Sequence, residues 1–182
     1  MAFNINEFSA QLDQKGVAKP SLFEVLVGRA GGSQTNEERD MVCRATAINF
    51  PSRQVLVAEN FVYGVPSPVA FGSATNGYMN ITFISSEYYD ERAYFENWID
   101  DIVGTYRKTK VATNMYDISY PKDYYGTVTI YTYTDVGENS LLLTLQDCFP
   151  VDVRTQDLNW GDPGVSYTQV TLAYRYTTEY EE

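Results

Sequence analysis

Apolar and polar side chains alternate along much of the chain in short runs rich in valine, threonine and tyrosine, a pattern that predicts β-strands. In residues 78–84, Met79, Ile81 and Phe83 alternate with polar or small residues, which is typical of a strand with one buried face. The segments that we predict as strands are 21–27, 41–48, 53–58, 78–84, 126–134, 140–148, 151–160 and 167–176. About eight strands indicate a mainly β protein, an antiparallel sandwich or barrel.

Turn-forming residues join the last four strands in pairs. Gly137 lies in the short "DVGEN" segment between strands 126–134 and 140–148. The sequence Asp162-Pro163-Gly164 separates strands 151–160 and 167–176. Both connections have the length and the residue types of hairpin turns, so we expect the two strands joined by each turn to pair antiparallel.

One segment, residues 86–103, departs from the strand pattern and predicts an amphipathic α-helix. On a helical wheel its apolar side chains form one stripe about 100° wide, which must be buried. Ser85 or Ser86 is suited to the N-cap, and Gly104 follows the last turn as a C-cap would. The residues that we predict to anchor this helix in the core are Tyr88, Phe95, Trp98, Ile99 and Ile102.

The first turns of this helix carry Glu87, Asp90 and Glu91, which raises the question of acid–base chemistry. Catalytic carboxylates usually face each other across a cleft from different elements, so helix capping and a solvated face are the preferred interpretation. Glu91 is the exception because it falls inside the apolar stripe, where an unpaired carboxylate is costly. We therefore expect it to pair with an Arg or Lys, on this chain or a neighbouring one, and we name it a candidate inter-subunit residue.

Residues 59–77 form a second unusual segment, which we predict to be an extended loop. Its prolines and glycines argue against a continuous central strand, yet it is rich in apolar side chains. It either folds back on its own domain or docks on another chain, because exposed apolar patches usually mark contacts. The candidate contact residues in it are Phe61, Tyr63, Val65, Val69 and Phe71.

The composition narrows the possible functions. Lys and Arg number 13 and Asp and Glu 24, so the formal net charge of 13 − 24 = −11 argues against a protein that grips nucleic acid. The chain has no histidine, which removes Ser-His and Cys-His catalysis and the commonest zinc ligand sets. Cys43 and Cys148 form no CxxC motif and are expected as reduced thiols. Carboxylates, Lys, Tyr or a bound cofactor remain as possible chemistry.

The length of 182 residues fits one domain, 1–182, with residues 1–20 as a polar N-terminal arm. The chain has no 18-residue apolar run, and its first residues lack the basic and apolar regions of a secretory signal. Neither a membrane span nor export is expected.

In its order of elements the chain resembles the tail tube proteins of contractile-tailed bacteriophages, whose fold is shared with the inner-tube proteins of type VI secretion systems. The stretches that carry the resemblance are "KPSLFEV", "CRATAINFP", "MNITFISSEYYDERAYFENWID" and "CFPVDVRTQDLNW…YTQVTLAYRYTTEY", in the family's order. The third is the most specific, because a strand runs directly into a helix whose Asp90, Arg92, Phe95 and Trp98 match the family pattern.

The resemblance implies a β-barrel or sandwich with one helix, six copies per ring, and rings stacked into a hollow tube inside a contractile sheath. Its implied partners are other copies of itself, the sheath protein, baseplate tube proteins, a tape-measure protein and DNA that passes through the lumen without specific binding. It implies a virion tail protein, assembled in the host cytoplasm, without enzymatic activity, cofactor or metal. It also makes residues 59–72 a candidate contact between rings. An acidic lumen would let DNA slide without sticking.

Two alternatives remain open from the sequence. A baseplate tube-like protein would share the same fold. A monomeric carbohydrate-binding β-sandwich would use some of the 16 Tyr and two Trp as an exposed platform, whereas a tube subunit would bury them in its core or its interfaces.

Overall fold

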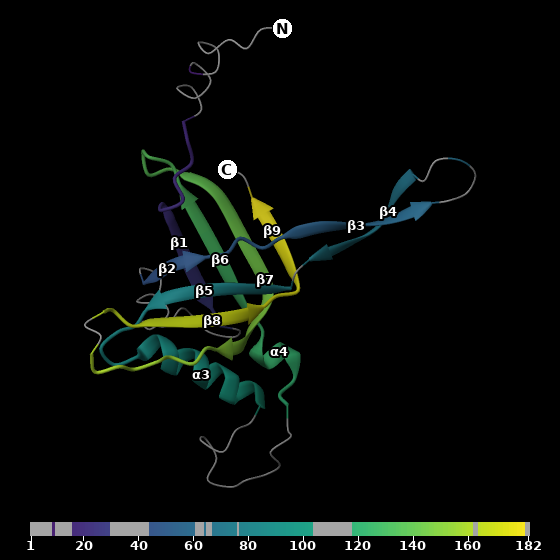
Figure 1. The fold of residues 1–182 in the computed structure, drawn as a ribbon. Helices are drawn as coiled ribbons and strands as arrows, with labels where there is room; N and C mark the ends of the chain where they lie inside the picture. Colours follow the sequence, from purple (N-terminus) through teal and green to yellow (C-terminus); the bar gives the residue numbers. More distant parts are fainter. Residues whose placement is uncertain are drawn as a thin grey trace.

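The computed structural model describes residues 9, 16–29, 44–60, 64, 67–75, 77–103, 118–161 and 164–180. The elements are β1 (Phe23–Gly28), β2 (Ala45–Ile48), β3 (Arg53–Asn60), β4 (Ser67–Thr75), β5 (Tyr78–Ile84), α3 (Asp90–Val103), α4 (Pro121–Tyr124), β6 (Gly126–Tyr133), β7 (Asn139–Val153), β8 (Tyr167–Ala173) and β9 (Tyr176–Tyr180). The strand pairs are antiparallel, and α3 is much longer than α4 (Figure 1). The predicted class, mainly β with one amphipathic helix, is confirmed.

The strands form two layers that share β7. Hydrogen bonding follows the order β1-β6-β7-β8-β5-β2, with β9 added beside β7. The first part of β7 pairs with β9 through Gln146 and with β6 as far as Cys148, and its last part, from Phe149, pairs with β8. Between them Asp147 has a φ of 55°, which marks a bulge at which the strand bends from one layer into the other (Figure 1).

The β3–β4 hairpin, Arg53–Thr75, stands apart from both layers. Its two strands pair with each other from Arg53↔Thr75 to Asn60↔Ser67 and project away from the body of the chain (Figure 1). The prediction of a loop over 59–77 is therefore wrong for most of its length. Pro68 and Gly72 argue against a central strand, but among the described strands β4 pairs only with β3, and a residue without an N–H is tolerated at its other edge.

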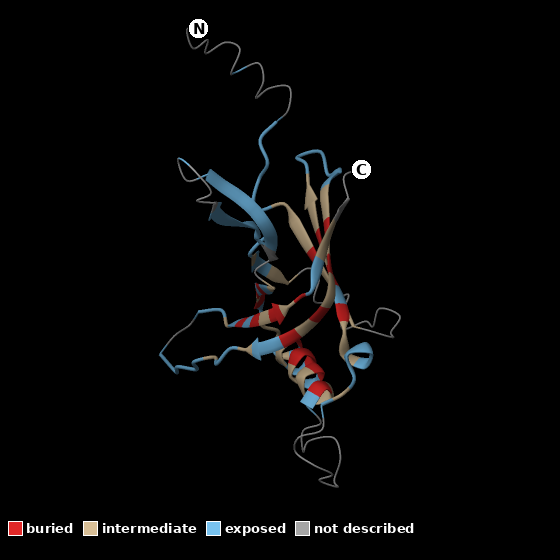
Figure 2. Cartoon of the chain, turned by 90° about the vertical axis from the view of Figure 1, so that its right-hand side faces the viewer, coloured by how far each residue is buried: buried red, intermediate tan, exposed pale blue. Residues whose placement is uncertain are grey.

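The core lies between the two layers, and α3 closes one side of it. Figure 2 shows the buried residues concentrated in the strands of the two layers and in α3. The rings of Phe83 on β5 and Phe95 on α3 have their centroids 5.6 Å apart, and Phe95 stacks on Trp98 at 6.4 Å. Helix and sheet therefore share one aromatic cluster, as the predicted apolar stripe requires.

Three other sequence predictions differ from the structure. The strand expected over 151–160 ends at Val153, although the amide of Arg154 still donates to the carbonyl of Gln169. The strand expected over 167–176 ends at Ala173, and the chain then enters β9, which pairs with β7 in the other layer. As a third difference, the short helix α4 was not among the predicted elements. Residues 16–20, within the predicted arm, contain neither helix nor strand.

Candidate assembly surfaces

The start of α3 is fixed by Ser86. The amide of Asp90 donates to the Ser86 hydroxyl at 2.9 Å, which satisfies one of the free N–H groups of the first turn. Tyr89 precedes the helix with a φ of 56°, and its carbonyl accepts from the amide of Ala93. Ser86 thus supplies the capping hydroxyl, one of the two expected choices, and the helix begins at Asp90 rather than at residue 86.

This later start changes the membership of the predicted anchor stripe. Phe95 and Trp98 are fully buried and Ile102 is buried, whereas Ile99 is half-buried. Tyr88 lies before the helix and is 81% exposed, so its prediction as a core anchor is wrong. Tyr94, which the sequence analysis missed, is buried in its place, with its ring edge-on to Phe95 at 5.3 Å.

Trp98 is the central anchor. Its indole Nε1 donates to the backbone carbonyl of Tyr124 at 2.8 Å, which ties α3 to α4. The segment before α4 also closes the end of the helix, because the amide of Ser119 donates to the carbonyl of Ile102 at 2.9 Å. These bonds satisfy polar groups that would otherwise be buried without partners.

Glu91 is buried with a basic partner from its own chain. Arg44 Nη1 donates to Glu91 Oε1 at 2.7 Å, and the Ser86 amide donates to Oε2 at 2.9 Å. Burial by itself raises the pKa of Glu91, but the hydrogen bonds from Ser86 and the charge of Arg44 outweigh it and hold the pKa below its usual value. Because the side chain is 2% exposed and both oxygens are engaged within this chain, Glu91 no longer qualifies as a candidate inter-subunit residue.

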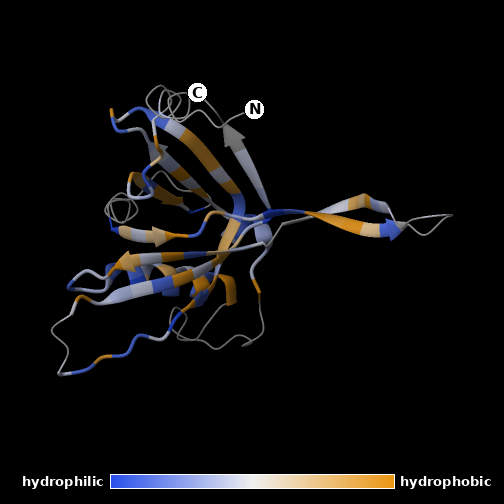
Figure 3. Ribbon diagram, turned by 45° about the horizontal axis from the view of Figure 1, so that its top comes forward, coloured by the Kyte–Doolittle hydropathy of each residue, from blue (hydrophilic) through white to orange (hydrophobic). Residues whose placement is uncertain are grey.

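The β3–β4 hairpin is the most exposed apolar element of the described chain. Each of its described side chains is exposed, because none of the other described strands or helices packs on either face of the hairpin. Figure 3 shows the hydrophobic residues along it. The large apolar side chains are Val55 (58% exposed), Leu56 (38%), Val57 (55%), Val69 (47%) and Phe71 (66%). The other three candidates, Phe61, Tyr63 and Val65, lie outside the described residues.

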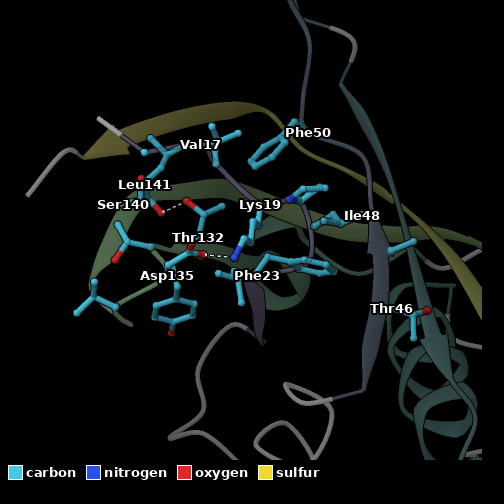
Figure 4. A pocket seen from close by; sticks show the side chains of 18 residues that line it. Val17, Lys19, Phe23, Thr46, Ile48, Phe50, Thr132, Asp135, Ser140 and Leu141 are labelled. Atoms are coloured by element: carbon cyan, nitrogen blue, oxygen red, sulfur yellow. Dashed lines mark hydrogen bonds and ion pairs between the residues drawn. The ribbon is translucent and has the colours of Figure 1, made fainter. Parts of the chain in front are cut away.

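A second feature is an open groove of about 860 Å³, which we call the seam groove. It lies between β1 and β2 and is closed at one end by the turn from β6 to β7 (Figure 4). Its lining consists of residues 16–20, Leu22, Phe23, Thr46, Ala47, Ile48, Phe50, residues 132–136, Ser140 and Leu141. The charged residues of this lining, Lys19 and Asp135, form an ion pair at 2.9 Å, so the lining carries no net charge. Most of its other side chains are apolar, and the rest are neutral Thr, Ser and Tyr. The sequence analysis did not find this groove.

A third exposed surface surrounds the loop between β7 and β8. Leu158 is 75% exposed, and the indole of Trp160 is completely exposed. The base of this loop is held by Gln156, whose amide donates to the hydroxyls of Ser85 and Ser166. The chain thus presents a Trp to solvent on a segment that is itself anchored.

No arrangement suited to catalysis is found in the described part of the chain. No group of three or more His, Cys, Asp and Glu side chains there could hold a metal ion. Glu87 and Asp90 are both exposed near the start of the helix. Of the helices described, none has the length and apolar character to cross a membrane.

The comparisons with known proteins agree with this picture of a structural subunit. No curated protein sequence matches the chain significantly. A chain of the anti-feeding prophage baseplate is 14% identical and superposes with a TM-score of 0.66, over 92% of this chain and 97% of that chain. A chain of the PVC extracellular contractile injection system, in its sheath-tube complex, is 12% identical with a TM-score of 0.59 over 96% and 98%. A chain of the anti-feeding prophage tube-terminating cap is 10% identical, also with a TM-score of 0.59, over 92% and 93%.

These three superpositions cover nearly the whole of each chain and show that the fold is the same. At sequence level, the profile of the phage tail tube proteins matches residues 2–180, almost the full length. This family and fold are structural rather than enzymatic. The chain therefore belongs to the phage tail tube protein family.

Proposed function

We propose that the chain is the subunit of a phage tail tube, in which hexameric rings stack into a hollow tube inside a contractile sheath. The observation that carries this proposal is the family match over residues 2–180. The single domain of residues 1–182 is the building block, and the N-terminal arm and the β3–β4 hairpin are the segments available for contacts between copies. The tape-measure protein occupies the lumen during assembly, in the host cytoplasm, and DNA passes through it at ejection.

The exposed apolar hairpin supports self-assembly. A two-stranded hairpin with solvent on both faces is at best marginally stable on its own. Val69 and Phe71 are among its exposed apolar residues, and contiguous exposed apolar surface usually marks a contact. Together with Phe61, Tyr63 and Val65, they remain candidate residues for the contact between subunits or between rings.

The charge of the chain supports a conduit rather than a DNA-binding role. The formal net charge of −11 is unsuited to gripping phosphates, but a negative field inside a tube lets a polyanion slide without being held. DNA would therefore be a passing occupant of the virion tail. The sheath protein and the baseplate tube proteins are the partners at the outside and at the end of the tube.

A baseplate tube-like protein of the same fold is the second candidate. The TM-score of 0.66 with the chain of the anti-feeding prophage baseplate favours it, compared with 0.59 for the chain of the sheath-tube complex. A tail tube subunit stacks its rings on copies of themselves, whereas a baseplate subunit forms one ring that joins different partners.

The carbohydrate-binding alternative rests on the exposed aromatic side chains. Trp98 is buried, but Trp160 is completely exposed in the single chain, as a residue in a sugar platform would be. An interface residue is exposed in the same way before assembly. The discriminating property is the oligomeric state, because a sugar-binding module would stay a monomer.

Negative-stain electron microscopy and sedimentation velocity of the purified protein test the proposal. Hollow tubes of stacked six-membered rings are expected. Isolated rings that never stack would favour the baseplate candidate. A monomer that persists at high protein concentration would contradict both.

A further inference from the structure

We propose that the seam groove between β1 and β2 is the docking site for the β3–β4 hairpin of a second copy of this chain. The inference rests on the proposed function, since it names the surface that receives the hairpin during ring or tube assembly. It follows from four features of the described residues: two open sheet edges, an unsupported hairpin, a shared lack of net charge, and the direction in which the hairpin projects.

The groove lies where the sheet fails to close. The hydrogen-bonded path runs from β1 to β2 through six strands, and among the described strands β1 pairs only with β6 and β2 only with β5. Phe23 of β1 and Ile48 of β2 both line the groove, so the two terminal strands of the path border the same space. Open edges of this kind offer unpaired backbone N–H and C=O groups to an added strand.

The hairpin has the complementary shape and chemistry. It is a narrow projection with exposed apolar side chains, among them Val57 and Phe71, and the outer edges of β3 and β4 are unpaired within the described chain. A groove of about 860 Å³ is large enough to receive several such side chains. A hairpin strand at the seam could therefore bury apolar surface and pair its backbone at the same time.

Charge favours contact between these two surfaces. Two copies that each carry a net charge of −11 repel one another over most of their surface. In the groove, Lys19 and Asp135 neutralise each other, and the charged side chains described on the hairpin, Arg53 and Glu59, also sum to zero. At the groove and the hairpin, two copies can therefore meet without bringing like charges together.

The hairpin cannot fill the groove of its own chain in this conformation. β2 runs into β3 through four residues, 49–52, and the hairpin then continues outward from the body, away from β1 (Figure 1). A contact in which the hairpin of one copy enters the groove of the next uses two different surfaces of each subunit. Such head-to-tail contacts close into rings or continue as filaments.

Cysteine cross-linking between two variants tests the contact. Phe71→Cys, with a C-terminal affinity tag, is mixed with untagged Val17→Cys, both in a Cys43→Ser background, and a mild oxidant is added. Val17 lines the groove and is 67% exposed, so its substitution leaves the core intact. A disulfide requires the two Cα atoms to come within about 7 Å, so a tagged–untagged heterodimer is expected only if the hairpin enters the groove.

The matched control replaces Val17→Cys by Tyr88→Cys, which is 81% exposed and does not line the groove. The heterodimer should form with Val17→Cys in at least about tenfold higher yield than with Tyr88→Cys. Equal yields, or none, overturn the proposed contact. An absent heterodimer in a sample that forms tubes overturns the contact alone, whereas absence of both overturns the proposed function as well. A heterodimer in a sample that forms no rings supports the contact between hairpin and groove and contradicts the proposed hexameric ring.

A second variant gives an independent measurement. Phe71→Asp places a charge in the apolar contact and should weaken self-association by at least about tenfold, while the circular dichroism spectrum stays that of the folded chain. Tyr88→Asp places the same charge at an exposed residue outside both the hairpin and the groove, so it should leave association unchanged. Unaltered association of Phe71→Asp would overturn the inference.

Discussion

The indole of Trp98 packs directly on the backbone of Gly126, so closely that no side chain fits between them. A Cβ at residue 126 would lie 2.7 Å from Cη2 of Trp98 and would also collide with the carbonyl oxygen of Gly28. Gly126 begins β6, and Gly28 ends β1, with which β6 pairs. The main helix therefore rests on the sheet at a point where the sequence must be glycine.

Gly126→Ala should destabilise the domain by about 1–3 kcal/mol, because the added methyl group forces the Trp98 ring or the β1 backbone to move. Urea unfolding monitored by circular dichroism measures this change. Gly72→Ala is the matched control, since a Cβ there would meet Leu56 at 3.7 Å, an ordinary contact. If Gly126→Ala is as stable as the unmodified protein, the packing of Trp98 on β6 is not as described.

Trp98→Ala should cost about 3–5 kcal/mol by leaving a cavity in the core, and it also removes the donor to the carbonyl of Tyr124. The second tryptophan provides the comparison. Trp160→Ala removes a fully exposed ring and should change the free energy of unfolding by no more than about 0.5 kcal/mol. Similar losses from both substitutions, measured by urea unfolding, would contradict the assignment of Trp98 as the anchor.

Glu91→Gln should lower the stability near neutral pH by about 1–3 kcal/mol, because Arg44 loses its charged partner. The pKa of Glu91 is lowered in the folded chain from the ordinary value of 4.5, so the folded state binds the proton less readily than the unfolded state does. This stabilisation is present above pH 4.5 and is lost as the pH falls through the lower folded pKa. The variant should therefore lose less further stability on acidification.

Urea midpoints at about pH 7 and about pH 3.5 measure the difference between Glu91→Gln and the unmodified protein. Glu87→Gln serves as the control, since Glu87 is exposed at the same end of the helix. Parallel pH profiles for Glu91→Gln and the unmodified protein would mean that the Arg44–Glu91 pair does not contribute to the acid response.

Cys148 should be inert toward Ellman's reagent in the folded protein. Its side chain is completely buried, and burial raises the pKa of the thiol to about 12, so the reactive thiolate is absent at ordinary pH. In a Cys43→Ser background, labelling at about pH 8 should be at least about 1,000-fold slower than in urea. Rapid labelling of the folded protein would show that β7 opens readily at Cys148.

The periodicity of the sequence predicted the class of fold and the burial of Phe95 and Trp98, because a continuous apolar stripe on a helix packs against a core. The same periodicity wrongly included Tyr88. The chain turns at Tyr89, whose positive φ no simple pattern indicates for a tyrosine, and the wheel therefore begins four residues later than predicted. The basic partner of Glu91 was expected but could not be named, since Arg44 lies 47 residues away in sequence, just before β2.

The assembly surfaces were less accessible to sequence analysis. Residues 59–77 were singled out as an apolar segment, but the sequence left open whether it folds back on its own domain or docks on another chain. Pro68 and Gly72 concealed a strand that pairs, among the described strands, only with β3. The seam groove left no local signal, because its walls come from the arm, β1, β2 and the β6–β7 turn. Only the three-dimensional path of the sheet brings its two terminal strands together.

Self-assembly should become stronger as the salt concentration rises. Copies with a net charge of −11 repel each other, while the proposed contact is apolar and neutral, so screening removes the repulsion and leaves the attraction. Raising the ionic strength from about 0.01 M to about 1 M shortens the Debye length from about 30 Å to about 3 Å, and sedimentation velocity at fixed protein concentration should show a growing assembled fraction. Glu87→Gln combined with Glu138→Gln, both exposed, changes the net charge to 13 − 22 = −9 and should assemble at lower salt. Assembly that weakens steadily with salt would instead show that ion pairs hold the copies together, and it would contradict an apolar contact between hairpin and groove.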